Sequence, residues 1–311
     1  MILNTGSRTD IPAFYSTWFY NRVRAGFVLA RNPYYPSQVL RYRLEPELVD
    51  AMVFCTKNPA PMLADPRDFE LLRPFSTFWF VTITPYGPDI EPKVPAKDRV
   101  VESFLQLSEL VGPQRMSWRY DPVFVSDAYP IARHVQEFER LAARLSGATD
   151  QCVVSFIDLY EKTKRNFPEA RAVTPAQQEE LVAAFAQIAE GYGLQIHLCC
   201  EDARLARPYV DAEGCLSQAV LEQATGCTLR VPARKGARAA CACLLGADIG
   251  AYNSCGHGCR YCYANSDRAA VARNMAWHDP ESPFLIGGAR PGDVVRDAKQ
   301  ESWRVMQGKL F

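Results

Sequence analysis

The sequence has no excess of charge of either sign and no long apolar run. Its 35 Lys and Arg residues balance 35 Asp and Glu residues, which argues against a broad surface for nucleic acid or an anionic membrane. No stretch approaches the ~18 consecutive apolar residues of a membrane-spanning helix. Arg8 and Asp10 interrupt the start of the chain before an apolar run of signal-peptide type forms. We therefore expect a cytoplasmic protein without a membrane partner.

Two patterns that mark nucleotide-binding and repeat proteins are also missing. No glycine-rich loop of Rossmann or Walker type follows any apolar run. The segment GGARPGD, 287–293, is typical of a turn. No internal repeat is evident beyond an alternation of strand and helix patterns. The sequence therefore contains no fingerprint for a nucleotide.

Cysteine, by contrast, is plentiful and unevenly placed. The chain has eleven cysteines, and nine of them lie between Cys199 and Cys262. Because a reducing compartment does not support a disulfide framework, this concentration of thiols indicates metal binding or catalysis. Cys55 and Cys152 stand apart, and we expect them to be core residues of their strands.

Short runs rich in β-branched and aromatic residues alternate with helical patterns in the first 200 residues. Six runs are predicted as strands: 1–5, 51–56, 78–84, 115–120, 152–160 and 194–200. Helices are predicted at 12–26, 98–112, 130–147 and 174–193. This alternation predicts βαβ units and a parallel sheet. Six units fit either a doubly wound open sheet or an incomplete barrel, and extra strands are expected at FVLAR (27–31) and QVLRYRL (38–44).

Charged residues stand where the predicted strands leave the sheet. Arg8 and Asp10 follow the first strand, Lys57 follows the second, and Arg119 and Asp121 end the fourth. Polar loops and helix caps explain some residues of this kind. Both candidate architectures place the active site at the carboxyl ends of the strands. These five residues are therefore predicted to line a pocket for a polar or zwitterionic ligand.

The segment SCGHGCRYCYAN, 254–265, places Cys255, Cys259 and Cys262 in a C-x3-C-x2-C pattern. Three interpretations compete for it. In the first, the thiols are buried cysteines without a ligand. In the second, they bind a structural zinc ion, with His257 or an upstream cysteine as the fourth ligand. In the third, they hold a [4Fe–4S] cluster, and a set of three cysteines leaves one iron open to an exogenous ligand.

The triplet, with Tyr261 just before its last cysteine, resembles the cluster signature of radical S-adenosylmethionine enzymes. The resemblance implies a [4Fe–4S] cluster on the three cysteines, whose open iron chelates S-adenosyl-L-methionine, and an electron donor such as flavodoxin or ferredoxin. It also implies a partial (β/α)6 TIM-like barrel. The whole chain further resembles an uncharacterised bacterial family of domains of unknown function with this cluster near the C-terminus. Since the triplet of the radical superfamily usually follows the first strand, the motif is permuted here.

A second set of cysteines lies upstream of the triplet. Cys199, Cys215, Cys241 and Cys243 are candidates for a second [4Fe–4S] cluster or a zinc site. Cys199 is preferred to Cys200 because successive side chains of a strand point to opposite faces. The alternative is that these are buried free cysteines, a common environment for this residue type.

The basic run PARKGAR, 232–238, precedes this second set. Such a run is typical of a solvated loop. As a functional segment it would bind a phosphate or a substrate carboxylate. It is also the feature on which a nucleic-acid partner would depend.

We therefore expect an α/β protein in three parts. These are a partial (β/α) barrel over 1–200, a cysteine-rich iron–sulfur region over 201–265 and a C-terminal extension over 266–311 that packs on the barrel. The leading hypothesis is a radical S-adenosylmethionine enzyme that cleaves its cofactor to a 5′-deoxyadenosyl radical and acts on a small-molecule substrate. The alternative is a non-catalytic protein with a structural zinc ion or iron–sulfur cluster. The enzyme hypothesis requires 254–265 to fold back to Arg8, Asp10 and Arg119.

Overall fold

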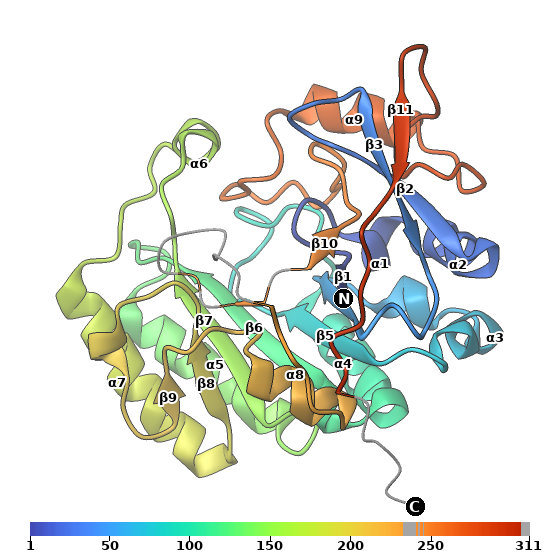
Figure 1. The fold of residues 1–311 in the computed structure, drawn as a ribbon. Coiled ribbons are helices and arrows are strands. Elements are labelled where there is room, and N and C mark those ends of the chain that lie inside the picture. Colours follow the sequence, from blue (N-terminus) through green and yellow to red (C-terminus); the bar gives the residue numbers. More distant parts are fainter. Residues whose placement is uncertain (233–240, 242, 245, 306–311) are drawn as a thin grey trace, which may run out of the picture.

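The computed structural model describes residues 1–232, 241, 243–244 and 246–305. Its main element is a parallel sheet of eight strands in the order β10–β1–β4–β5–β6–β7–β8–β9 (Figure 1). The strands are β1 (Ile2–Asn4), β4 (Ala51–Thr56), β5 (Thr77–Thr82), β6 (Met116–Val123), β7 (Gln151–Phe156), β8 (Gln195–Leu198), β9 (Val210–Asp211) and β10 (Ala247–Asp248). The edge strands β9 and β10 do not pair with each other, so the sheet is not closed.

The prediction of an α/β fold with a parallel sheet is confirmed. Each of the six predicted strands corresponds to a strand of the main sheet, from β1 through β8. A partial TIM-like barrel is not confirmed: the main sheet has eight strands and is open at β9 and β10. Those two edge strands are two residues long, too short for a periodic pattern to reveal.

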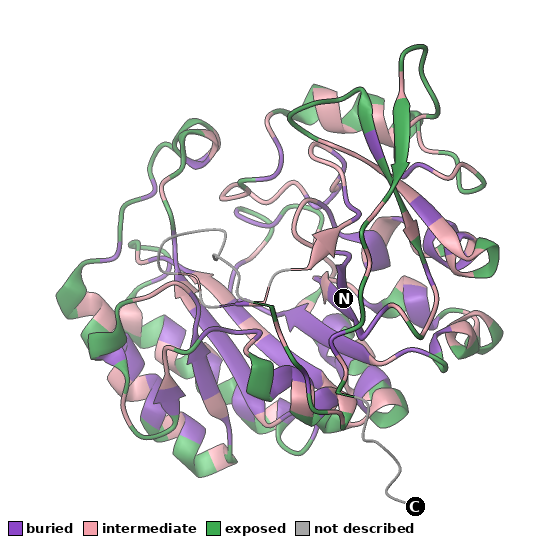
Figure 2. Ribbon diagram, in the orientation of Figure 1, coloured by how far each residue is buried: buried purple, intermediate pink, exposed green. Residues whose placement is uncertain are grey.

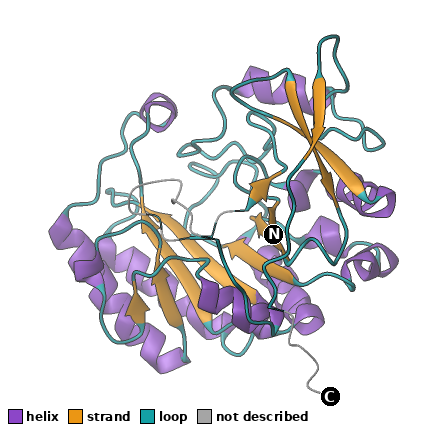
Figure 3. Ribbon diagram, in the orientation of Figure 1, coloured by secondary structure: helices purple, strands orange, loops and turns teal. Residues whose placement is uncertain are grey.

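Helices separate most of the strands (Figure 3). The α-helices are α1 (Ile11–Phe14), α2 (Ser16–Ala25), α3 (Pro66–Phe69), α4 (Lys97–Val111), α5 (Ile131–Leu145), α6 (Glu161–Asn166), α7 (Pro175–Tyr192), α8 (Gln218–Thr225) and α9 (Arg268–Ala276). The 3₁₀ helices are η1 (Ala60–Leu63), η2 (Glu70–Leu72), η3 (Pro113–Arg115) and η4 (Ala203–Leu205). None of the helices in the described part of the chain is both long and apolar enough to cross a membrane.

One face of the main sheet packs against α4, α5 and α7. The Trp118 ring of β6 lies 4.7 Å from Phe138 of α5, and Phe138 stacks on Phe185 of α7 at 4.1 Å between centroids. All three side chains are fully buried. Burying each of them contributes on the order of 1.5–3 kcal/mol. This aromatic layer fixes the strands, whose central part is buried throughout (Figure 2).

The opposite face of the sheet carries the alternate residues of the same strands. Val53, Phe80 and Val153 pack there against Leu221 of α8 and against Trp303 near the C-terminus. The thiols of three cysteines belong to the same buried layer, namely Cys199, Cys215 and Cys243. This face is therefore covered by segments that follow β8, whereas α4, α5 and α7 cover the other face.

A second sheet of three strands has the order β11–β3–β2 and lies on the β1 side of the main sheet (Figure 1). Its strands are β2 (Phe27–Arg31), β3 (Gln38–Arg43) and β11 (Val294–Asp297). The extra strands predicted at FVLAR and QVLRYRL are thus present, but in a separate sheet. β11 pairs with β3 in parallel, which brings a late segment of the chain against an early one.

Candidate functional site

The pairing of β10 with β1 decides where the cysteine triplet lies. Ala247 pairs with Leu3 and Asp248 with Asn4 in a parallel register. The N–H of Ile249 then donates to the carbonyl of Asn4 at 3.1 Å. Because parallel strands end at one edge, here called the carboxyl edge, the chain leaves β10 beside the loop that follows β1. The segment 254–265, here called the cluster loop, therefore starts next to the first strand in space although it follows all the strands of the main sheet in sequence.

Arg8 fixes the entry to the cluster loop. Its Nε lies 3.2 Å from the carboxylate of Asp248, and its Nη2 donates to the Asp248 carbonyl at 2.9 Å. Burial raises the pKa of Asp248, and the nearby guanidinium of Arg8 opposes that shift. The Asp248 carboxylate also accepts a hydrogen bond from the N–H of Gly250 at 2.7 Å, as expected for a residue that closes a turn.

Asp10 joins three loops at the carboxyl edge. Its Oδ2 lies 2.8 Å from Nε2 of His257 and accepts a hydrogen bond from the backbone N–H of Lys57 at 2.8 Å. Its Oδ1 caps α1 by accepting from the N–H of Ala13 at 3.0 Å. The other ring nitrogen of His257, Nδ1, lies 3.4 Å from the carbonyl of Lys93. Since protein oxygens face both nitrogens, His257 serves the loop rather than a metal ion.

A buried ionic network lies behind the cluster loop. Glu91 is buried and accepts from Nζ of Lys57 at 2.9 Å, from Nζ of Lys97 and from the hydroxyl of Tyr261. Burial opposes the charge of Glu91, but the two ammonium groups and these hydrogen bonds outweigh it and lower its pKa to about 2. The aromatic residue of the C-x2-C step is therefore held by a carboxylate that two lysines keep ionised.

The three thiols of the cluster loop are half-buried. Burial raises the pKa of Cys255, Cys259 and Cys262, to about 12 for Cys259. Their sulfur atoms do not form a group within 4.8 Å of one another. In a [4Fe–4S] cluster each thiolate binds a different iron, whereas a single zinc ion draws its ligands together. At least one pair of these sulfur atoms thus lies farther apart than the ligands of a single zinc ion would.

The backbone of the cluster loop is held close to α1. A Cβ atom at Gly256 would come within 2.7 Å of the Phe14 ring, so a larger residue there would force that ring to move. The Tyr15 hydroxyl donates to the carbonyl of Ser254 at 2.5 Å, and the Asn265 amide donates to the carbonyl of Cys255 at 2.9 Å. These contacts close the loop on itself and on the helix that follows β1.

Arg119 and Asp121 occupy the middle of the carboxyl edge, on the face that α8 covers. The Arg119 guanidinium donates to the Asp121 carboxylate, which also accepts from the Ser155 hydroxyl. Nη1 of Arg119 lies 3.9 Å from the sulfur of Cys55. Cys152 is buried in the core as predicted. Cys55 of β4 is half-buried and packs against the buried layer that α8 covers, with its sulfur also facing Arg119.

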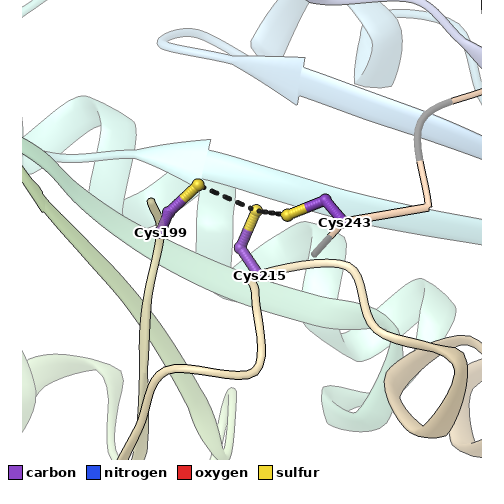
Figure 4. Close-up of side chains that lie close together, drawn as sticks. All are labelled: Cys199, Cys215 and Cys243. Carbon is purple, nitrogen blue, oxygen red and sulfur yellow. Dashed lines mark hydrogen bonds between the residues drawn. The ribbon is translucent and has the colours of Figure 1, made fainter. Parts of the chain in front are cut away.

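A second group of thiols lies beside Arg119. The sulfur of Cys215 is 3.6 Å from that of Cys199 and 3.3 Å from that of Cys243, and all three residues are buried (Figure 4). We call these three residues the buried thiol group. Of the four cysteines predicted to act together, Cys241 does not belong to it. Cys199, rather than Cys200, does, as expected from the alternation of side chains.

Sequence reasoning missed two charged residues of the site. Glu91 accepts hydrogen bonds from Lys57 and Tyr261, and Lys97 donates to Glu91. Both residues follow β5, but neither ends a predicted strand. The sequence feature that could have indicated them is the proline-rich segment 85–97, which carries charged residues after the third predicted strand. The basic run 232–238 lies outside the described residues except for Pro232.

A cavity of about 400 Å³ lies at the opposite edge of the sheet. Gln151 and Gln195, the first residues of β7 and β8, line it together with His197 and Asp211. In parallel sheets of this kind, ligands bind outside the carboxyl ends of the strands. This cavity therefore stands apart from the candidate site.

Comparison with known proteins identifies the family of this chain. A family model described as "Domain of unknown function (DUF1848)" matches residues 2–264, which include all eight strands of the main sheet and the three cysteines of the cluster loop. No curated protein matches, and no solved structure matches. The match therefore supplies no reaction. The chain belongs to the DUF1848 family.

Proposed function

We propose that this protein is an iron–sulfur enzyme of the radical S-adenosylmethionine type with a spatially permuted cluster loop. One observation carries the proposal: β10 pairs with β1, so the loop after β10 lies at the carboxyl edge beside Asp10 and Lys57. That is the neighbourhood in which the superfamily motif, placed after the first strand, would lie. The sheet order from β1 through β8 is also compatible with a partial six-unit barrel.

In this proposal Cys255, Cys259 and Cys262 hold a [4Fe–4S] cluster. These residues would hold the cluster, and the chemistry it would supply is the one-electron reduction that cleaves S-adenosyl-L-methionine to methionine and a 5′-deoxyadenosyl radical. The electron comes from a protein donor such as flavodoxin or ferredoxin in the cytoplasm. The three raised thiol pKa values mean that cluster binding has to displace protons, which is usual for metal-bound thiols.

The charged residues of the carboxyl edge divide into two roles. Arg8 and Asp10 contact the cluster loop and its lead-in strand, so they position the loop. Arg119 and Asp121 pair in the middle of the edge, and Lys57, which is bonded to Glu91, is near both Asp121 and Cys259. We assign Arg119, Asp121 and Lys57 to the pocket for the cofactor carboxylate and for a polar small-molecule substrate.

Anaerobic reconstitution tests the proposal directly. The protein is loaded with iron and sulfide, reduced with dithionite and given S-adenosyl-L-methionine. We expect equal amounts of methionine and 5′-deoxyadenosine, and we expect a variant with Cys255, Cys259 and Cys262 changed to Ser to form neither. Cys227→Ser is the matched control, since Cys227 is half-buried outside both thiol sets. A fully loaded cluster that yields neither product would refute the proposal.

A non-catalytic metal protein is the second candidate. The observation in its favour is the buried thiol group, which is arranged for a metal ion whatever the cluster loop does. For a structural zinc ion in the cluster loop, His257 is not free to be the fourth ligand, because Asp10 and Lys93 engage its two ring nitrogens. Elemental analysis of anaerobically purified protein separates the two candidates: zinc without iron would favour the second.

A further inference from the structure

We propose that Cys199, Cys215 and Cys243 bind a zinc ion at a site separate from the cluster loop. Among the described residues, their sulfur atoms form a group in which all members lie within 4.8 Å of one another. Figure 4 shows the three side chains pointing at one another from three segments of the chain. The inference does not depend on the proposed enzyme activity, because it uses none of the three cysteines of the cluster loop.

The distances between the sulfur atoms favour a single metal ion over an iron–sulfur cluster. Cys215 lies 3.6 Å from Cys199 and 3.3 Å from Cys243. Zinc–sulfur bonds of about 2.3 Å in a tetrahedron separate neighbouring sulfurs by about 3.8 Å. A [4Fe–4S] cluster binds each thiolate to a different iron and requires wider spacing. The buried thiol group therefore has the dimensions of three of the four ligands of a zinc ion and not of a second cluster, and the fourth tetrahedral position is left to a ligand other than these three cysteines.

The surroundings of the buried thiol group suit a metal that is shielded from water. The three residues are 8, 6 and 7% exposed, in the order Cys199, Cys215 and Cys243. Val153, Leu216 and Leu221 belong to the same apolar layer. Three thiolates and Zn²⁺ carry one net negative charge, and binding to three thiols releases three protons. The Arg119 guanidinium, paired with Asp121, is a nearby cation.

The zinc ion would tie together three segments of the chain. Cys199 directly follows β8, Cys215 lies two residues before the N-cap of α8, and Cys243 lies four residues before β10. The N–H of Leu244 donates to the carbonyl of Leu216 at 2.9 Å, which aligns two of these segments. Because β10 leads into the cluster loop, the ion would anchor the chain that carries that loop. We therefore assign the site a structural role in placing the cluster loop.

Metal analysis of the full chain, purified without chelators and supplied with zinc, tests this inference. We expect about one zinc ion per chain. Cys199→Ser, Cys215→Ser and Cys243→Ser should each lower the zinc affinity at least about tenfold, while Cys227→Ser should leave it unchanged. The variant with serine at all three cysteines of the cluster loop should lose iron and keep zinc. This last result separates the zinc site from the proposed enzyme.

A second measurement on the unaltered chain covers variants that fail to fold. With zinc bound, alkylation followed by mass spectrometry should find Cys199, Cys215 and Cys243 protected, and a chelator should expose all three. Protection that a chelator does not remove would overturn the inference, as would iron in place of zinc on these thiols. A reducible disulfide between any two of the three, in protein without zinc, would overturn it as well.

Discussion

At the scale of single residues, Asp10 connects the early and late parts of the chain. Its carboxylate meets His257 of the cluster loop, the N–H of Lys57 and the N-terminus of α1. Asp10 and His257 are both buried. If one of them is removed, water cannot replace the hydrogen bond that the other loses. A residue singled out as a pocket lining from sequence thus serves to hold the loop.

We expect Asp10→Ala to destabilise the protein and to weaken retention of iron. The imidazole of His257 and the N–H of Lys57 lose their acceptor, and two buried unsatisfied groups cost about 2–4 kcal/mol. Urea unfolding and iron content after reconstitution measure the two effects. Asp127→Ala is the control, because Asp127 is exposed. Equal behaviour of the two variants would contradict the assigned role of Asp10.

We expect Gly256→Ala to distort the cluster loop. The new Cβ would lie 2.7 Å from the Phe14 ring, and overpacking of this kind costs about 1–3 kcal/mol. Gly288→Ala is the matched control, since no atom lies within 4 Å of a Cβ at that position. Adding Phe14→Leu to Gly256→Ala should restore part of the lost stability and iron content. If the second change makes both quantities worse, steric contact with Phe14 is not the cause.

At the scale of elements, the two-residue strand β10 determines where the cluster loop lies. It forms the edge of the main sheet next to β1 and directs the chain into the cluster loop. The approach is close: a Cβ at Gly246 would lie 2.1 Å from the carbonyl oxygen of Ile2. The atom that a Cβ would strike belongs to the backbone of β1 and not to a flexible side chain. Any residue other than glycine at position 246 would therefore prevent β10 from pairing with β1 in this register.

We expect Gly246→Ala to displace β10 from β1. Iron content after reconstitution should fall severalfold, because the cluster loop loses its anchor at the carboxyl edge. Amide hydrogen exchange should quicken at Ile249, whose N–H donates to Asn4, while α7 keeps its protection. Unchanged exchange at Ile249 together with full iron content would show that β10 does not place the loop.

The long helix α7 shows how local sequence decides an element. Thr174 accepts from the N–H of Gln177, the Gln177 side chain accepts from the N–H of Thr174, and Pro175 stands at the first helical position. A cap of this kind contributes about 1 kcal/mol. The start of the helix was therefore predictable from Thr174 and Pro175 alone, without tertiary contacts.

At the scale of the whole molecule, a buried histidine makes stability depend on pH. His134 of α5 is fully buried, with Nδ1 at 3.0 Å from the Tyr120 hydroxyl and Nε2 at 2.8 Å from the carbonyl of Phe124. Burial lowers the pKa of His134 to about 4, against an opposing contribution from the Phe124 carbonyl. Between pH 6.5 and pH 4 the unfolded chain therefore binds a proton that the folded chain does not.

We expect this difference to lower the free energy of unfolding as the pH falls through that window. A shift of the pKa from 6.5 to about 4 corresponds to about 3 kcal/mol. Urea unfolding at pH 7 and pH 4.5 measures the loss, and His134→Gln should show a smaller loss over the same interval. If the variant and the original protein lose the same stability, His134 is not the group responsible.

The sequence by itself determined six strands of the main sheet, several helices and the spacing of the cysteines. The runs that form β4, β5 and β7 and the cap of α7 are local signals, because side-chain alternation and capping depend on neighbours along the chain. The spacing of Cys255, Cys259 and Cys262 is equally local, so it could be recognised directly.

Only the tertiary structure decided which of these parts meet. The pairing of β10 with β1, the contact of Asp10 with His257 and the selection of Cys243 over Cys241 join residues far apart in sequence. Such contacts depend on sheet order and on the close approach of packed backbones, and no local pattern encodes either. The position of the cysteine triplet near the end of the chain looked displaced in sequence. In space it lies beside the first strand, because β10 pairs with β1. Backbone hydrogen bonds can join two parallel strands however far apart they are in sequence.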